Sequence, residues 1–263
     1  TTRVLSEGQS RLVSNKINVT NDKKFNTSEL LPYLRQPAEP WSPGLCVYNW
    51  QNGKGKGWDK FVLKLGKEPV IFDSLMLKSS NLNLKDHLQY LGYYDSQVKA
   101  EVKREKSKKV KVNYFVTLGK RYPIRSISYE LPLQRDFIHD FYADTSLCSI
   151  KKGNFLSEND LEKESSRSAS IIRDKGYYDF NKNYYFFEAD TLSVKDSASL
   201  RIIVRDYTRN EKEGDQSREF LKYTLGKISV TYPEQLKFRT KVLSDINNLK
   251  SGELYNEKRI NNV

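Results

Sequence analysis

The chain has 263 residues, a net charge of +12, and many aromatic side chains, with 17 tyrosines and 12 phenylalanines. This length allows one large or two to three small domains, and no apolar run approaches the roughly 20 residues of a membrane-spanning helix. No secretory leader opens the sequence, so we expect a mature or trimmed segment. The excess of Lys and Arg favours an acidic partner, such as nucleic acid, anionic lipid or protein, although a solvated basic surface has the same composition.

The two cysteines, Cys46 and Cys148, have no CxxC neighbour, and the chain has only two histidines, His87 and His139. These few residues do not fit a zinc site or a Cys-His catalytic pair. His139 adjoins Asp140, but adjacent residues on a helix do not face each other. We therefore expect two free thiols, no metal, no cofactor and no enzymatic activity.

The first predicted elements are a strand over residues 11–19 and a helix over 26–36, in which Asn26 or Thr27 is the cap. An irregular stretch follows over 37–58. It ends in Asn-Gly-Lys-Gly-Lys-Gly-Trp, which has glycines and lysines that could hold a phosphate. A phosphate-binding loop would carry Ser or Thr after its Lys, so a surface loop is the better interpretation.

A second helix is predicted over residues 79–92, because leucines recur there at i, i+4 and i+7. Ser79 or Ser80 is its predicted cap, and Gly92 is its predicted left-handed end. Alternating apolar residues then predict a hairpin. Its elements are strands over 97–104 and 109–118 with a turn over 105–108.

The same order of elements follows in the second half of the chain. A strand over 121–131 precedes a helix over 133–142, and a helix over 157–176 is capped by Ser157, with Asp160 three residues later. Gly176 is its predicted end. The later elements are strands over 177–190, 198–208 and 222–232, and a helix over 233–249.

The order of elements indicates an internal repeat. Gly-Tyr-Tyr-Asp occurs at 92–95 and again at 176–179, each time between a helix and a hairpin, and residues 150–161 align with 249–260. A unit of strand, helix, helix, strand and strand thus occurs about two and a half times. Its starts lie near residues 10, 121 and 222.

These repeats predict an α+β fold, in which each unit is a small three-stranded mixed sheet with two helices on one face. The predicted domains are 1–120, with an inserted loop near 37–58, then 121–220, and an incomplete unit over 221–263. A lone strand with one and a half helices cannot bury a core. We therefore expect a longer chain that supplies the missing hairpin and then a barrel.

Two motifs carry a resemblance to a known family. "KKGNFLSENDLEKE…IIRDKGYYDF" and "GKRYPIRSISYEL" resemble the POTRA repeat, which forms the periplasmic arm of the outer-membrane superfamily containing BamA and TamA. Gly66–Asp73, "GKEPVIFD", resembles an element of the Bacteroidetes TamA-like lipoproteins (TamL), with one Lys inserted. The resemblance implies a periplasmic location at the outer membrane, a lipid anchor at the N-terminus, a TamB-like bridging partner and outer-membrane client polypeptides.

In such a unit the first strand pairs with the third, which leaves the second strand at the edge of the sheet. The predicted edges are residues 97–104 and 183–190, where free main-chain groups could bind an extended peptide. The candidate partner-binding residues are Gln97, Val98, Lys99, Ala100, Lys103, Arg104, Tyr184, Tyr185 and Phe186. The basic residues among them could instead serve only to prevent edge-to-edge aggregation.

Two other interpretations stay open. The aromatic run from Tyr184 to Phe187 loosely resembles a base-stacking platform, but an alternating strand would turn half of these rings into the core. This argues against nucleic acid as a partner. The chain could also be a free basic adaptor module without a barrel, and only further strands beyond it would distinguish the two possibilities.

Overall fold

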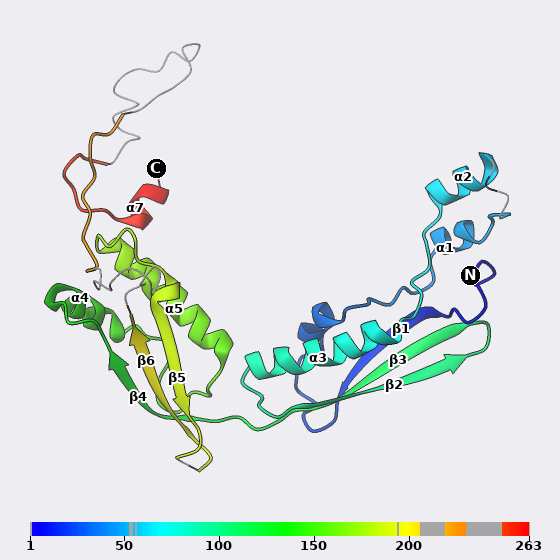
Figure 1. The fold of residues 1–263 in the computed structure, drawn as a ribbon, viewed down its shortest axis with the longest axis horizontal. Helices are drawn as coiled ribbons and strands as arrows, with labels where there is room; N and C mark the ends of the chain where they lie inside the picture. The colour runs from blue at the N-terminus through cyan, green and yellow to red at the C-terminus, as the bar shows by residue number, and fades with distance from the viewer. Residues whose placement is uncertain are drawn as a thin grey trace, which may run out of the picture. The chain divides into compact units, whose positions relative to one another are not determined.

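The computed structural model describes residues 2–52, 55, 57–193, 195–205, 219–229 and 249–262. The chain divides into two compact units, residues 1–121 and 122–263 (Figure 1). Within the described ranges, no helix is both long enough and apolar enough to cross a membrane. The α+β fold class that the sequence predicts is confirmed, because each unit contains a three-stranded mixed sheet with helices.

The sheet of the first unit has the order β1-β3-β2. The strands are β1 (Arg11–Val19), β2 (Gln97–Glu105) and β3 (Lys109–Thr117), with β1 parallel and β2 antiparallel to β3. The 3₁₀ helix η1 (Thr27–Tyr33) and helix α3 (Ser74–Tyr90) complete the crossover between β1 and β2. Figure 1 shows α3 lying along one face of this sheet.

The core of the first unit lies between α3, η1 and that face. Alternate residues of β3 point into it, as its period-two pattern predicts. The buried residues are Leu12, Leu30, Leu34, Leu84, Leu88, Val110, Val112, Tyr114, Val116 and Leu118.

The predicted start of α3 at Ser79 or Ser80 is wrong. The helix begins at Ser74, and the Asp73 side chain caps it by accepting the N–H of Leu75 at 2.7 Å. Ser80 is buried in mid-helix, where its hydroxyl donates to the Met76 carbonyl at 2.8 Å. A serine that bonds back to its own helix resembles a cap in the sequence but does not end the helix.

The inserted stretch also contains more structure than its sequence predicts. Helix α1 (Pro43–Tyr48) lies inside the predicted irregular range, and helix α2 (Gly57–Leu65) begins at its end. Figure 1 shows both helices projecting from the end of the sheet at which β1 begins. Asn26 is the cap of η1, one of the two predicted alternatives.

The second unit repeats the arrangement, with the sheet order β4-β6-β5. Its strands are β4 (Ile124–Glu130), β5 (Tyr185–Asp190) and β6 (Ala198–Val204), and its helices are α4 (Arg135–Thr145), α5 (Glu158–Asp174), η2 (Lys182–Tyr184) and α7 (Glu257–Asn261). Ser157 caps α5 by accepting the N–H of Asp160, as predicted. The predicted strand from residue 177 begins only at Tyr185, because Asn181 caps the short helix η2 first.

Parts of the predicted third repeat lie outside the described residues: the helix over 233–249, apart from its last residue, and the strand segment 230–232. In the described segment 222–229, the single β-pairing is an isolated bridge at Thr224.

One isolated bridge occurs at each of three matching places, where the start of a predicted repeat pairs with the segment before its second helix. In each, two main-chain hydrogen bonds of 2.7–2.8 Å join residues on either side of the bridge. The bridged pairs are Arg11–Ile71, Pro123–Phe155 and Thr224–Leu254. The paired residues are 60, 32 and 30 positions apart (71 − 11, 155 − 123, 254 − 224), so the first unit carries the insertion.

Candidate functional site

The two edges of the first sheet differ in how they are covered. Residues Val70–Phe72 of the "GKEPVIFD" element lie against the start of β1, where the Leu12 N–H donates to the Val70 carbonyl at 2.8 Å. Among the described residues, no strand pairs with the outer side of β2. The β2 edge is therefore the open one, as the sequence predicts from the crossover rule.

The direction of the main-chain groups along β2 follows from its neighbours. The Thr20 N–H donates to the Val116 carbonyl at 2.8 Å, so Val116 directs its main chain toward β1. Val98 is the β2 partner of Val116, and successive residues of a strand alternate. Hence Val98, Ala100, Val102 and Arg104 direct their N–H and C=O groups away from β3, toward the free edge.

The side chains of β2 alternate as well. Val98 and Ala100 pack against the core beside α3. Gln97, Lys99 and Lys103 are exposed and occupy the alternate positions, on the opposite face of the sheet. A strand bound at this edge would thus meet the main-chain groups of β2, and the lysine side chains on the face of the sheet opposite α3.

The second edge, β5, is built in the same way but has more aromatic residues. The Arg205 N–H donates to the Tyr184 carbonyl at 3.0 Å, so Tyr184 directs its main chain toward β6. Because successive residues of a strand alternate, Tyr185, Phe187 and Ala189 direct their main-chain groups outward, away from β6. The Phe186 side chain is 47% exposed, and the Arg205 guanidinium lies 5.8 Å from its ring centroid. This exposed ring and cation form the surface beside the edge.

The structure places Tyr185 differently from the other candidate residues. Its side chain is buried, and its hydroxyl bonds to the Ser168 hydroxyl at 2.8 Å. Burial raises the pKa of this phenol. Tyr185 therefore presents only its main chain at the edge, and its part in binding a partner stays a prediction.

Behind Tyr185 lies a buried ionic network that the sequence analysis missed. The Arg167 guanidinium bonds to both oxygens of Asp144 at 2.9 Å and to Glu164 at 2.6 and 3.0 Å. Ser149 donates its N–H and hydroxyl to Glu164. Burial alone would raise the pKa of the Glu164 carboxyl, but the hydrogen bonds from Arg167 and Ser149 outweigh it and hold that pKa below its usual value. The network fixes α4, α5 and the loop before α5 behind the β5 edge.

The repeated Gly-Tyr-Tyr-Asp turn has a visible role in the second unit. Gly176 has φ +104°, and Gly92 has φ +88°, so both end their helices in the left-handed conformation that was predicted. The Gly176 carbonyl accepts the Tyr223 N–H at 2.8 Å, and the Tyr178 ring lies 5.0 Å from that of Tyr255. The turn is thus the surface on which Tyr223 and Tyr255 pack.

Two ion pairs strengthen this packing. Arg173 pairs with Glu257 at 2.7 Å, and Lys222 pairs with Asp140 at 2.7 Å. Burial would raise the pKa of Asp140, but the hydrogen bonds from Lys222 and Tyr177 outweigh it and lower that pKa.

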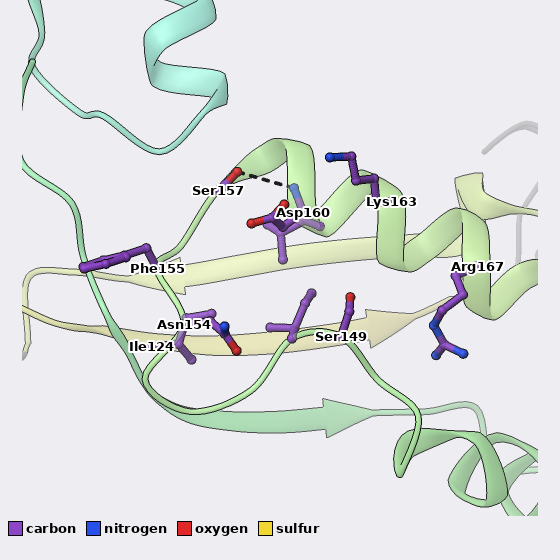
Figure 2. Close-up of a pocket in the computed structure, with 10 residues that line it drawn as sticks. Ile124, Ser149, Asn154, Phe155, Ser157, Asp160, Lys163 and Arg167 are labelled. Atoms are coloured by element: carbon purple, nitrogen blue, oxygen red, sulfur yellow. Dashed lines mark hydrogen bonds between the residues drawn. The ribbon is translucent and has the colours of Figure 1, made fainter. Parts of the chain in front are cut away.

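A pocket of about 430 Å³ lies beside the first turns of α5. Figure 2 shows Ser157, Asp160 and Lys163 on the helix side and Ser149 and Asn154 on the loop side. Several polar groups of this lining already hold the fold: Ser157 caps the helix, Ser149 binds Glu164, and Arg167 belongs to the buried network. The described residues contain no group of His, Cys, Asp or Glu that could hold a metal ion.

A comparison with known protein families finds a match in the first unit. The family described as "POTRA: Surface antigen variable number repeat" matches residues 13–119. This similarity covers the first unit from β1 to β3. No curated protein matches the chain.

Three solved structures are similar to this chain at low sequence identity. Haemophilus influenzae BamA POTRA3-5 is 14% identical, with 98% of this chain and 85% of that chain covered and a TM-score of 0.46. The N-terminal domain of Omp85 from Thermosynechococcus elongatus is 13% identical, with 98% and 84% covered and a TM-score of 0.30. BamA from Haemophilus ducreyi lacking POTRA domains 1-3 is 16% identical, with 74% of this chain covered and a TM-score of 0.37. The chain spans 29% of that protein.

Proposed function

We propose that this chain is the periplasmic POTRA arm of an outer-membrane β-barrel protein, and that it takes part in outer-membrane protein assembly or lipid transport. In this proposal the arm has no catalytic role and binds extended segments of client or accessory proteins at the β2 and β5 edges. The POTRA match over residues 13–119 supports the family assignment. The observation that carries the binding proposal is the open β2 edge, along which alternate residues direct their main-chain groups outward.

The chemistry of such an edge fits a protein with many clients. Main-chain hydrogen bonds do not depend on the sequence of the bound strand, so one edge can bind many extended segments. Lys99 and Lys103 beside the edge would add attraction for acidic segments. We further propose that the chain belongs to the TamA-like lipoprotein branch, with a TamB-like bridging protein among its partners and an N-terminal lipid anchor. The resemblance of the "GKEPVIFD" element to that branch supports this placement.

The test uses two neighbouring proline substitutions in β2. Ala100→Pro removes an N–H that points to the free edge, whereas Glu101→Pro removes an N–H that bonds to β3. The probe is a fluorescein-labelled peptide of ten residues with alternating apolar and polar side chains, and amide chemical shifts locate where it binds.

We expect the peptide to perturb the amides of residues 97–105, and Ala100→Pro to weaken its binding about tenfold while the chain stays folded. Glu101→Pro should lower the stability of the first unit more than Ala100→Pro does, because it removes a hydrogen bond between β2 and β3. Unchanged binding by Ala100→Pro, or shifts confined to other parts of the chain, would contradict the edge as the binding site.

A further inference from the structure

The insertion in the first unit carries all three tryptophans of the chain. Each is exposed: Trp41 by 67%, Trp50 by 57% and Trp58 by 52%. Large apolar side chains usually face a core or a partner, so three exposed indoles in one short segment mark an interaction surface.

Helix α2 organises this surface. Trp58, Phe61 and Leu65 recur at i, i+3 and i+7, which places them on one side of the helix. All three are more than half exposed, and the Trp58 and Phe61 rings lie 6.0 Å apart. Lys60 and Lys64 are also exposed and, by their helical spacing, lie along one border of this stripe.

The stripe faces outward because the helix is already anchored on its other side. Val62 of α2 and Leu45 of α1 are buried. The Asp59 carboxylate is also buried, and it accepts the N–H groups of Asn52 at 2.7 Å and Gly55 at 2.8 Å. The only acidic side chain of α2 is therefore used within the insertion, and its two exposed charges are lysines.

We propose that helix α2, together with Trp41 and Trp50, binds the surface of a phospholipid bilayer that contains anionic headgroups. Indole rings prefer the boundary between headgroups and acyl chains, and lysines beside an apolar stripe attract anionic lipid. A bilayer accepts exposed rings without a matching pocket.

The size of the stripe also favours a bilayer over a protein partner. Helix α2 has nine residues and is therefore about 13 Å long. A stable protein interface buries about 800 Å² on each partner, far more than one face of such a helix offers.

The experiment uses the 263-residue chain and two kinds of vesicle, phosphatidylcholine alone and phosphatidylcholine with one third phosphatidylglycerol. Because every tryptophan lies in the insertion, tryptophan fluorescence, excited at a wavelength that tyrosine does not absorb, reports on this segment alone. We expect a blue shift of the emission and co-sedimentation with the anionic vesicles.

Three double variants separate the contributions, and all keep the three tryptophans. Phe61→Ser with Leu65→Ser should weaken binding about tenfold, since two exposed apolar side chains would no longer enter the interface. Lys60→Gln with Lys64→Gln should weaken binding to anionic vesicles about tenfold, and its effect should shrink as salt is raised. Leu133→Ser with Leu192→Ser is the control, because these leucines of the second unit are 100% and 95% exposed.

The control should bind as the unchanged chain does, and all variants should melt at nearly the same temperature because the substituted side chains are exposed. The proposal is overturned if neither vesicle shifts the emission, or if Phe61→Ser with Leu65→Ser binds normally. It is also overturned if the control loses binding to the same extent.

Discussion

Gly176 offers a sharp test of how the Gly-Tyr-Tyr-Asp turn packs against Leu254. A Cβ atom built at this position would lie 2.8 Å from both Cδ1 and Cγ of Leu254, and the residue has φ +104°. Gly153 also has positive φ, +89°, but a Cβ there would meet nothing within 4 Å. Gly153→Ala therefore carries only the conformational cost, whereas Gly176→Ala carries that cost and a collision.

The magnitudes follow from these contacts. An alanine in the left-handed region costs about 1–2 kcal/mol at either glycine. At Gly176 the Leu254 side chain must also move by several tenths of an ångström, which we expect to cost about 1 kcal/mol more, because Leu254 is 43% exposed and has room to shift. Combining Gly176→Ala with Leu254→Ala should remove this excess.

Hydrogen exchange measures the effect where it arises. The Tyr223 amide donates to the Gly176 carbonyl at 2.8 Å, so its protection reports whether the segment around Tyr223 is docked on the turn. We expect Gly176→Ala to increase its exchange at least about fivefold over Gly153→Ala. Equal exchange in the two variants, or an excess that persists without the Leu254 side chain, would refute the packing argument.

Two further predictions concern the interior of the second unit. Arg167→Met should cost about 3–5 kcal/mol at neutral pH, because Asp144 and Glu164 would remain buried without their cation. The lowered pKa of Glu164 stabilises the unchanged chain at pH values above the carboxyl's unfolded pKa, and this stabilisation is lost as pH falls through the folded pKa. In Arg167→Met the folded pKa of Glu164 rises instead. Denaturant titrations of this variant should therefore show stability falling as pH increases through that raised pKa. Cys148 is buried, and burial raises the pKa of its thiol, whereas Cys46 is only half-buried. Iodoacetamide should therefore modify Cys46 first in the native chain, as followed by mass spectrometry. Faster modification of Cys148 would contradict its buried placement.

Local sequence signals determined much of the fold. Period-two alternation located the strands of the first hairpin, and the Ser157 cap and the two glycines of the Gly-Tyr-Tyr-Asp turns located helix ends, because these features depend on a few neighbouring residues. The repeat order, with right-handed crossovers, also predicted that β2 and β5 are edge strands.

Contacts between distant segments decided the rest. Ser80 resembles a cap in the sequence, yet it lies within α3. The helix is capped earlier, by Asp73, which follows the segment that pairs with the start of β1. Tyr185 lies in an aromatic run whose direction depends on the register with β6, and that register turns its ring onto Ser168. The Asp144–Glu164–Arg167 network joins residues of two helices, and α2 is held by a buried Asp59 that binds the loop before it. No local pattern encodes such partners, because burial and hydrogen bonding are properties of the packed chain.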